Sequence, residues 1–150
     1  MQLQFSIVLN RRRDDVWRAF DRVDSLKKWQ PTLVSFEPQS GTPGEVGAIS
    51  KLTYLENNRT IVLTEVVTLR QPPREFAGTY DSGMAINHVH NRFEELGDGT
   101  TQWTMTAEFR FTGLWKLLSP LFRGMIKKRL QADAQRFREL LEAGELDPQE

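Results

Sequence analysis

The chain has 150 residues, 39% of them hydrophobic and 10% aromatic, which is enough for one domain with its own core and too few for two ordinary domains. Twenty basic residues balance twenty acidic ones, so the positive excess typical of nucleic-acid-binding proteins is missing and no nucleic-acid partner is expected. The chain contains no cysteine, which excludes disulfides and thiolate-bound metals. The two histidines, His88 and His90, are too few for a metal site, and we expect no metal and no other cofactor.

Two features of the chain predict where it acts and where its domain ends. No apolar run is long enough to span a membrane, and the basic Arg11–Arg13 follow the first apolar stretch, the reverse of a signal peptide. We therefore expect a cytoplasmic protein. The polar residues 145–150 resemble a tail, so a single domain is expected over residues 1–144.

The N-terminal third predicts a strand, two short helices and two more strands. Residues 2–10 alternate between apolar and polar side chains, which is the period of a half-buried strand. Asp14 and Asp15 then precede apolar residues at helical spacing, as at a helix N-terminus. A second short helix is expected at about 25–29, ending before Pro31. Strands are expected at 33–37 and 48–56, on either side of a turn-rich segment.

Four turns predict the register of a strand meander that follows. They are the two-residue turns Asn57-Asn58 and Ser82-Gly83, the loop 71–75, and the three-residue loop 97–99. The predicted cross-strand pairs include Ser50–Glu65, Glu65–Tyr80, Leu69–Phe76, Tyr80–Ala85, Gly78–Asn87, Phe76–Val89, Phe93–Trp103 and Asn91–Met105. These separately assigned registers place the large apolar residues on one face and His88, His90 and most charged residues on the other. An antiparallel sheet with one buried and one solvated face has this pattern.

The C-terminal part predicts a long helix over Pro120–Ala143. Ser119 and Pro120 are typical of an N-cap and a first helical position, and Gly144 of a helix end. The helix would be about 36 Å long at 1.5 Å per residue, enough to cross the sheet. The expected fold is therefore α+β: a curved antiparallel sheet wrapped around a long C-terminal helix, with two short helices between the first two strands.

Several short motifs together resemble a known superfamily over about the whole chain. They are Val16-Trp17, Trp29-Gln30-Pro31, Val46-Gly47, Pro72-Pro73-Arg74, Gly99-Thr100, Arg136-Phe137 and Leu140-Leu141-Glu142. In this order they resemble the START-like, Bet v 1-type (SRPBCC) superfamily, and more narrowly its polyketide cyclase/dehydrase and lipid-transport group. The resemblance implies the helix-grip fold. Because the superfamily includes lipid carriers, hormone binders, aromatase/cyclases and co-chaperones, the function depends on the cavity.

Polar residues interrupt the predicted apolar face of the sheet. They are Ser50, Glu65, Tyr80, Asn87 and Asn91. A solid core disfavours such groups, because an unpaired buried amide costs about 1–3 kcal/mol and a carboxylate more. They favour a mostly apolar pocket with a few polar groups that orient a small molecule. The alternative is that they satisfy one another without a ligand.

The predicted pocket lies between the sheet and the long helix. Its expected walls are Leu52, Tyr54, Leu63, Glu65, Tyr80, Asn87, Asn91, Trp103 and Met105 from the sheet, and Leu118, Phe122, Met125 and Ile126 from the helix, with Trp29 at the open end. The function expected first is binding or carriage of a hydrophobic small molecule such as a lipid, an isoprenoid or an aromatic polyketide. A polyketide cyclase or dehydratase is the first alternative, with catalytic Glu65 and Tyr80, since burial would raise the pKa of Glu65 toward neutrality. A protein-interaction module with a filled cavity is the third.

The segment 114–129 predicts a second possible contact surface. Basic residues interleave there with Leu114, Trp115, Leu117 and Leu121, and no acidic residue occurs between Glu108 and Asp133. Such a segment could dock transiently on an anionic membrane. The alternative is a solvated basic face above apolar residues that pack on the core. A monomer or weak dimer is expected.

Overall fold

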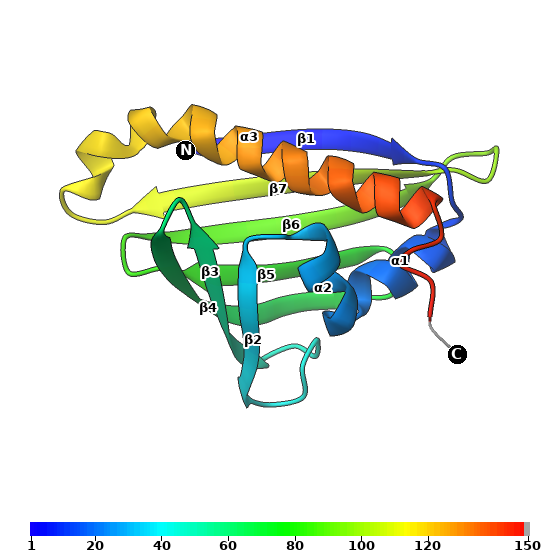
Figure 1. Cartoon of the computed structure of the whole chain (residues 1–150), viewed down its shortest axis with the longest axis horizontal. Helices are drawn as coiled ribbons and strands as arrows, with labels where there is room; N and C mark the ends of the chain where they lie inside the picture. The colour runs from blue at the N-terminus through cyan, green and yellow to red at the C-terminus, as the bar shows by residue number, and fades with distance from the viewer. Residues whose placement is uncertain (149–150) are drawn as a thin grey trace.

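The computed structural model describes residues 1–148 and contains one seven-stranded sheet and three helices (Figure 1). The strands are β1 (Gln2–Leu9), β2 (Leu33–Ser40), β3 (Ile49–Glu56), β4 (Arg59–Gln71), β5 (Glu75–Asp81), β6 (Ala85–Glu95) and β7 (Thr101–Phe111), and the helices are α1 (Arg13–Asp21), α2 (Val23–Trp29) and α3 (Trp115–Glu142). The sheet order is β1-β7-β6-β5-β4-β3-β2, and every neighbouring pair is antiparallel. The predicted α+β class is confirmed.

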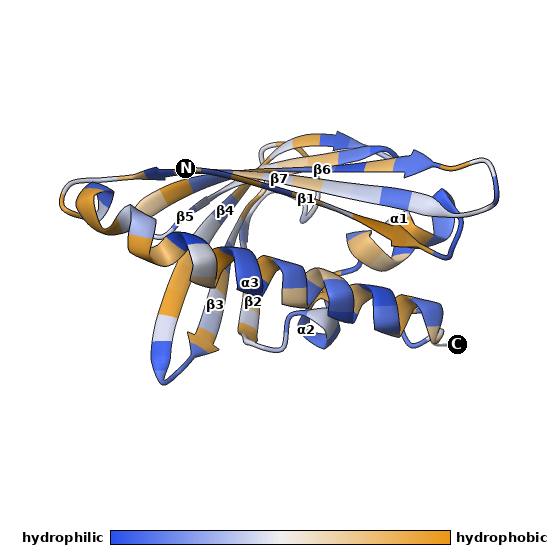
Figure 2. Cartoon of the chain, turned by 90° about the horizontal axis from the view of Figure 1, so that it is seen from above, coloured by the Kyte–Doolittle hydropathy of each residue, from blue (hydrophilic) through white to orange (hydrophobic). Residues whose placement is uncertain are grey.

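The long helix α3 crosses the concave side of the curved sheet, and α2 lies beside its C-terminal half (Figure 2). The helices α1 and α2 follow β1 and close one end of the molecule (Figure 1). This arrangement confirms the predicted helix-grip fold. Within residues 1–148, no helix combines the length and the apolar character that crossing a membrane requires.

Most of the predicted strand register is correct. Asn57 and Asn58 have φ of 51° and 62°, as a two-residue hairpin turn of this kind requires, and Ser50 pairs with Glu65. The loop 97–99 sets Phe93 opposite Trp103 and Asn91 opposite Met105, as predicted. The pairing of Leu69 with Phe76 was wrong, because an irregularity between Val67 and Leu69 moves Phe76 opposite Arg70.

The turn between β5 and β6 differs from the prediction by one residue. Its central residues are Gly83 and Met84, since Asp81 pairs with Ile86 and Ser82 N–H donates to the Ala85 carbonyl at 3.1 Å. Gly83, with φ of 83°, supplies the positive φ that the first central position of such a turn needs. The predicted Tyr80–Ala85, Gly78–Asn87 and Phe76–Val89 pairs were therefore wrong by two residues. A shift of two keeps every side chain on its predicted face.

Helix α3 begins five residues before the predicted start at Pro120. Proline has no N–H to bond the carbonyl four residues earlier, which is that of Lys116. The Ser119 hydroxyl donates to this carbonyl at 2.9 Å and takes the place of the missing bond. The predicted N-cap role of Ser119 was wrong, because the helix begins at Trp115 and Ser119 lies inside it.

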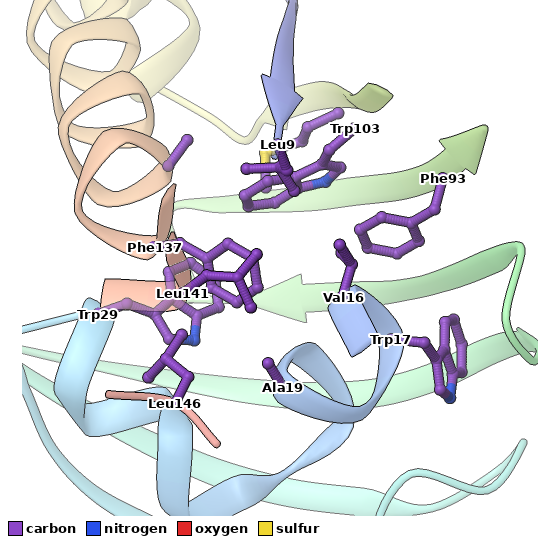
Figure 3. Close-up of a cluster of buried hydrophobic side chains, with 12 residues drawn as sticks. Leu9, Val16, Trp17, Ala19, Trp29, Phe93, Trp103, Phe137, Leu141 and Leu146 are labelled. Carbon is purple, nitrogen blue, oxygen red and sulfur yellow. The ribbon is translucent and has the colours of Figure 1, made fainter. Parts of the chain in front are cut away.

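The core is an aromatic cluster centred on Trp103, which is fully buried (Figure 3). Its ring lies between 5.3 and 6.0 Å, centroid to centroid, from the rings of Phe5, Phe20, Trp29, Phe93 and Phe137. These rings come from β1, α1, α2, β6 and α3. The cluster therefore fastens all three helices to one end of the sheet.

The residues after α3 do not form a wholly polar tail. Leu146 is 1% exposed and belongs to the buried cluster (Figure 3), and its carbonyl accepts a hydrogen bond from Arg22 at 3.0 Å. Gly144, with φ of 78°, turns the chain back after the helix. The core thus extends past the expected boundary at residue 144, and the last two residues of the expected tail, 149–150, lie outside the described residues.

Candidate functional site

A cavity of about 350 Å³ lies between the sheet and α3. Its wall is mostly apolar, and its apolar residues include Phe20, Leu26, Phe36, Leu52, Ile61, Leu63, Phe76, Val89, Met105, Phe109, Ile126 and Leu130. The volume is in the range of cavities that hold small organic ligands. The C-terminal half of α3 is packed on the aromatic cluster, while the sheet curls from β6 to β3 and β2 toward the side of the helix, and the cavity lies in this curve (Figure 2).

The structure brings ten of the fourteen predicted site residues to this cavity. They are Trp29, Leu52, Tyr54, Leu63, Glu65, Tyr80, Asn87, Asn91, Met105 and Ile126. Trp29 is 3% exposed and stacks with Phe20 at 6.1 Å, so it lies at the inner end of the cavity and not at its mouth.

The other four predicted residues lie outside the cavity wall. Trp103 is part of the core, where its indole N–H donates to Asn91 Oδ1 at 3.0 Å. Leu118 and Met125 are 41% and 56% exposed. Phe122 stacks on Phe111 at 6.3 Å. The buried residues of α3 all lie in its C-terminal half, and of the four helix residues predicted for the wall only Ile126 lines the cavity.

Four polar residues form a row across adjacent strands, and three of them, Glu65, Tyr80 and Asn87, line the cavity. Ser50 pairs with Glu65, Glu65 with Tyr80, and Tyr80 with Asn87. The turn at Gly83-Met84 places Asn87 opposite Tyr80 and so adds Asn87 to the row. The predicted register had placed Ala85 there. Ser50 and Glu65 are 1% and 7% exposed, so the row combines hydrogen-bonding groups with a desolvated carboxyl group.

Glu65 and Tyr80 form a coupled pair within the row. Burial raises the pKa of Glu65 above its ordinary value, while the hydrogen bond from the Tyr80 hydroxyl partly opposes this rise. Burial and the neighbouring carboxylate also raise the pKa of Tyr80, so its phenol stays protonated and donates to Glu65. Gly78 lies beside this ring, where a Cβ would meet the Tyr80 hydroxyl oxygen at an ordinary 3.6 Å but the Val66 carbonyl at a close 3.1 Å.

The two asparagines of β6 differ in how well they are satisfied. The Asn91 side chain accepts from Trp103 and donates to the Phe76 carbonyl at 3.4 Å. Asn87 Oδ1 is buried, and among residues 1–148 it has no hydrogen-bond partner. An unsatisfied buried acceptor at a cavity wall is suited to a donor on a bound molecule.

A second polar group lies on the helix side of the cavity, and our sequence interpretation did not include it. Arg129 of α3 forms an ion pair with Glu56 and donates to the Thr32 hydroxyl at 3.0 Å. Asp133 lies one turn further along α3, and burial raises its pKa to about 6. Asp133 follows Leu130 by three residues on the inward-facing stripe of the helix. A charged residue on an apolar stripe is the feature of the sequence that could have indicated a polar group in the cavity.

Both histidines lie on the opposite face of the sheet, as predicted. His90 Nε2 lies 3.1 Å from the Glu75 carboxylate, and His88 is exposed opposite Glu108. Within residues 1–148, no three His, Asp or Glu side chains form a cluster that could hold a metal ion.

The solved structures to which the chain is similar share this fold. They include the Zhui aromatase/cyclase from Streptomyces (TM-score 0.82, 14% identity, 96% of this chain and 94% of that chain). Two others are Ara h 8.0201 (TM-score 0.78, 15% identity, 95% and 98%) and a protein from Thermus thermophilus (TM-score 0.78, 13% identity, 96% and 99%). At these identities the likeness shows the fold alone.

The comparison with sequences gives the family. No curated protein matches the chain significantly. The sequence profile of one family, described as polyketide cyclase / dehydrase and lipid transport, matches residues 1–142 and so includes every strand, all three helices and the whole cavity wall. The chain therefore belongs to the polyketide cyclase/dehydrase and lipid transport family.

Proposed function

We propose that the protein binds and carries a hydrophobic small molecule, of the lipid, isoprenoid or aromatic polyketide type, in the cavity between the sheet and α3. The observation that carries the proposal is a largely apolar cavity of about 350 Å³ with a short polar row on its floor. Sites for small organic molecules combine an apolar wall with a few orienting polar groups in this way. The family, whose description includes lipid transport, is consistent with this function.

The polar row supports a ligand because the protein does not satisfy it completely. A buried acceptor such as Asn87 Oδ1 costs about 1–3 kcal/mol when it has no donor. A ligand hydroxyl or amine would remove this cost, while its apolar body would remain against Leu52, Leu63 and Val89.

The test is a pair of variants on β4 whose side chains lie on opposite faces of the sheet. Leu63 lines the cavity, whereas its neighbour Val62 is 41% exposed. We expect Leu63→Trp to weaken binding of an uncharged fluorescent apolar probe by at least about tenfold, and Val62→Trp to leave it unchanged. If both variants bind the probe equally well, the probe binds outside the cavity and the proposed site is wrong. Native mass spectrometry of protein purified from its own host would then identify the co-purifying molecule.

Glu65 and Tyr80 favour a second candidate function, a cyclase or dehydratase reaction on a polyketide-like substrate. Burial raises the pKa of the Glu65 carboxyl group, which makes it a better proton acceptor than an ordinary glutamate, and the tyrosine hydroxyl can polarise a substrate carbonyl. If this candidate is correct, Glu65→Gln and Tyr80→Phe should abolish turnover while both variants still bind the apolar probe. If turnover survives both substitutions, neither Glu65 nor Tyr80 is required for the reaction.

The third candidate, a protein-interaction module, requires a filled cavity. The open volume favours the two ligand-binding candidates over it. Binding of the apolar probe, and its loss in Leu63→Trp, would separate the candidates by experiment.

We also propose a transient membrane contact through the segment 114–129. Leu114, Leu117 and Leu121 are 79%, 78% and 76% exposed, so these side chains do not pack on the core. Lys116, Arg123 and other basic residues lie among them, which favours an anionic bilayer as the partner. The double variant Leu117→Asp/Leu121→Asp should stop co-sedimentation with phosphatidylglycerol vesicles, with phosphatidylcholine vesicles as the control. Sedimentation velocity would test the proposed monomer or weak dimer.

A further inference from the structure

The cavity wall contains more negative than positive charge. It has four carboxyl groups, from Asp21, Glu56, Glu65 and Asp133, and two guanidinium groups, from Arg22 and Arg129. Their formal sum is two negative charges. A mostly apolar cavity screens such charges less than water does, so the imbalance affects which ligands are tolerated.

Two of the four carboxylates are neutralised by arginines within the protein. Asp21 lies 2.7 Å from Arg70, and Glu56 pairs with Arg129. Glu65 and Asp133 have no ion-pair partner among residues 1–148. With Arg70 counted, the wall keeps two carboxylates without an ion pair, one on the sheet and one on the helix. One guanidinium, that of Arg22, forms no ion pair among residues 1–148, so the remaining formal charge is one negative.

The arginines nearest to Asp133 donate to other groups. Arg129 is bonded to Glu56 and Thr32, and Arg136 donates to the Lys28 carbonyl at 2.8 Å. Arg22, the other basic residue of the wall, donates to the Leu146 carbonyl at 3.0 Å. The Asp133 carboxylate therefore keeps its capacity to accept a hydrogen bond from a ligand.

Tyr54 lies close enough to Asp133 and Glu65 for both carboxylate charges to act on its hydroxyl group. Burial raises the pKa of its hydroxyl most, and the charges of Asp133 and Glu65 each raise it further. This hydroxyl donates to Gln30 Oε1 at 2.7 Å, so it has no proton left for either carboxylate. Together with Asn87 Oδ1, the cavity thus offers acceptors from both walls, and the buried indole N–H of Trp29 is a wall donor without a partner among residues 1–148.

We propose that the ligand of this cavity carries a protonated amine on an apolar body, and that the amine lies between Asp133 of α3 and Glu65 of β4. An ammonium group brings three donors and a positive charge, which match the acceptors and the charge excess. An alcohol would donate to one acceptor and leave both carboxylate charges without a counter-charge. A ligand carboxylate would add a third negative charge. The inference rests on the proposed function, because it names the chemical class that the same cavity would take.

The test compares three ligands with the same unbranched apolar chain: dodecylamine, dodecanol and dodecanoate. Each displaces the uncharged probe N-phenyl-1-naphthylamine at about pH 7.5, where the amine is protonated and the fatty acid ionised. We expect dodecylamine to bind about tenfold more tightly than dodecanol, and dodecanoate more weakly than both. Asp133→Asn and Glu65→Gln should each remove most of the preference for amine over alcohol.

The matched control is Glu139→Gln, an exposed carboxylate of the same helix that lies outside the cavity wall. This variant should keep the full amine preference, which separates a local contact from general attraction to an acidic surface. Circular dichroism of each variant identifies loss of fold, and either cavity substitution alone is sufficient to test the inference.

The outcomes distinguish this inference from the proposed function. If dodecanol or dodecanoate displaces the probe as well as dodecylamine does, the amine inference is wrong and a hydrophobic-ligand carrier remains. An amine preference that survives in both cavity variants also overturns it. If the wild-type protein binds neither the probe nor any of the three compounds, the proposed carrier function itself is wrong.

Discussion

Replacing Asn91 by leucine should destabilise the protein even though leucine suits an apolar wall. The Asn91 side chain is 3% exposed and accepts a hydrogen bond of 3.0 Å from the Trp103 indole N–H. Leucine would leave this N–H of Trp103, which is fully buried, without an acceptor. The loss of one partner of a buried pair costs more than the loss of both.

The magnitude follows from the desolvation of the indole N–H. We expect Asn91→Leu to lower the free energy of unfolding by about 1–3 kcal/mol, the cost of one unsatisfied buried donor. Trp103→Phe removes this donor but also loses part of a fully buried ring, at a cost of about 2–4 kcal/mol. In the double variant both polar groups are absent, so its cost should be smaller than the sum of the single costs by about 1–2 kcal/mol.

Urea unfolding followed by far-ultraviolet circular dichroism gives the three free energies on one scale. Additive costs would refute the reasoning, because they would show that the hydrogen bond contributes nothing beyond the packing of each residue. An Asn91→Leu variant as stable as the wild type would do the same. A control at the exposed Asn58, Asn58→Gly, keeps the positive φ of the turn and should change stability little.

Three further predictions concern other elements. The folded-state pKa of Asp133, about 6, lies above its ordinary 3.8 despite the nearby Arg129 and Arg136, so its ionisation opposes folding above pH 6. Asp133→Asn should therefore stabilise the protein by about 1 kcal/mol at neutral pH, with a gain that fades toward pH 4 in thermal unfolding. Leu146→Ala should cost about 2–4 kcal/mol in urea unfolding, against almost nothing if this residue belonged to a free tail. Gly78→Ala should lower the free energy of unfolding by about 1–3 kcal/mol in urea unfolding, since the new Cβ would lie 3.1 Å from the Val66 carbonyl and the backbone would have to shift; unchanged stability would contradict this packing.

Turn chemistry made most of the sheet predictable. Asn57-Asn58 and the loop 97–99 fix their registers through residues that tolerate positive φ, so the pairs Ser50–Glu65 and Phe93–Trp103 followed from sequence. Around Gly83 the sequence allows two neighbouring turns, which differ only in whether glycine comes first or second. The first central position of such a hairpin turn needs positive φ, which glycine supplies and serine does not, so Gly83-Met84 forms and the prediction that placed glycine second was wrong by one residue.

The helix side of the cavity was harder to predict. Apolar spacing alone placed Leu118, Phe122 and Met125 in the wall, because periodicity gives the face of a helix but not how much of its length meets a partner. The helix contacts are determined by the aromatic cluster, which gathers rings from five separate elements around Trp103. Asp133 was missed because a single charge on an apolar stripe becomes significant only when the facing wall is known.

The unequal anchoring of α3 has a consequence for motion. Ala134, Phe137 and Leu141 hold its second half in the core, whereas the first half shows Leu117 and Leu121 to solvent. Local opening of the first half therefore breaks few tertiary contacts and requires much less free energy than global unfolding. Amide protons before Ile126 should exchange orders of magnitude faster than those around Phe137. A molecule could thus pass between the cavity and its surroundings on the timescale of helix fraying, while the aromatic cluster stays intact.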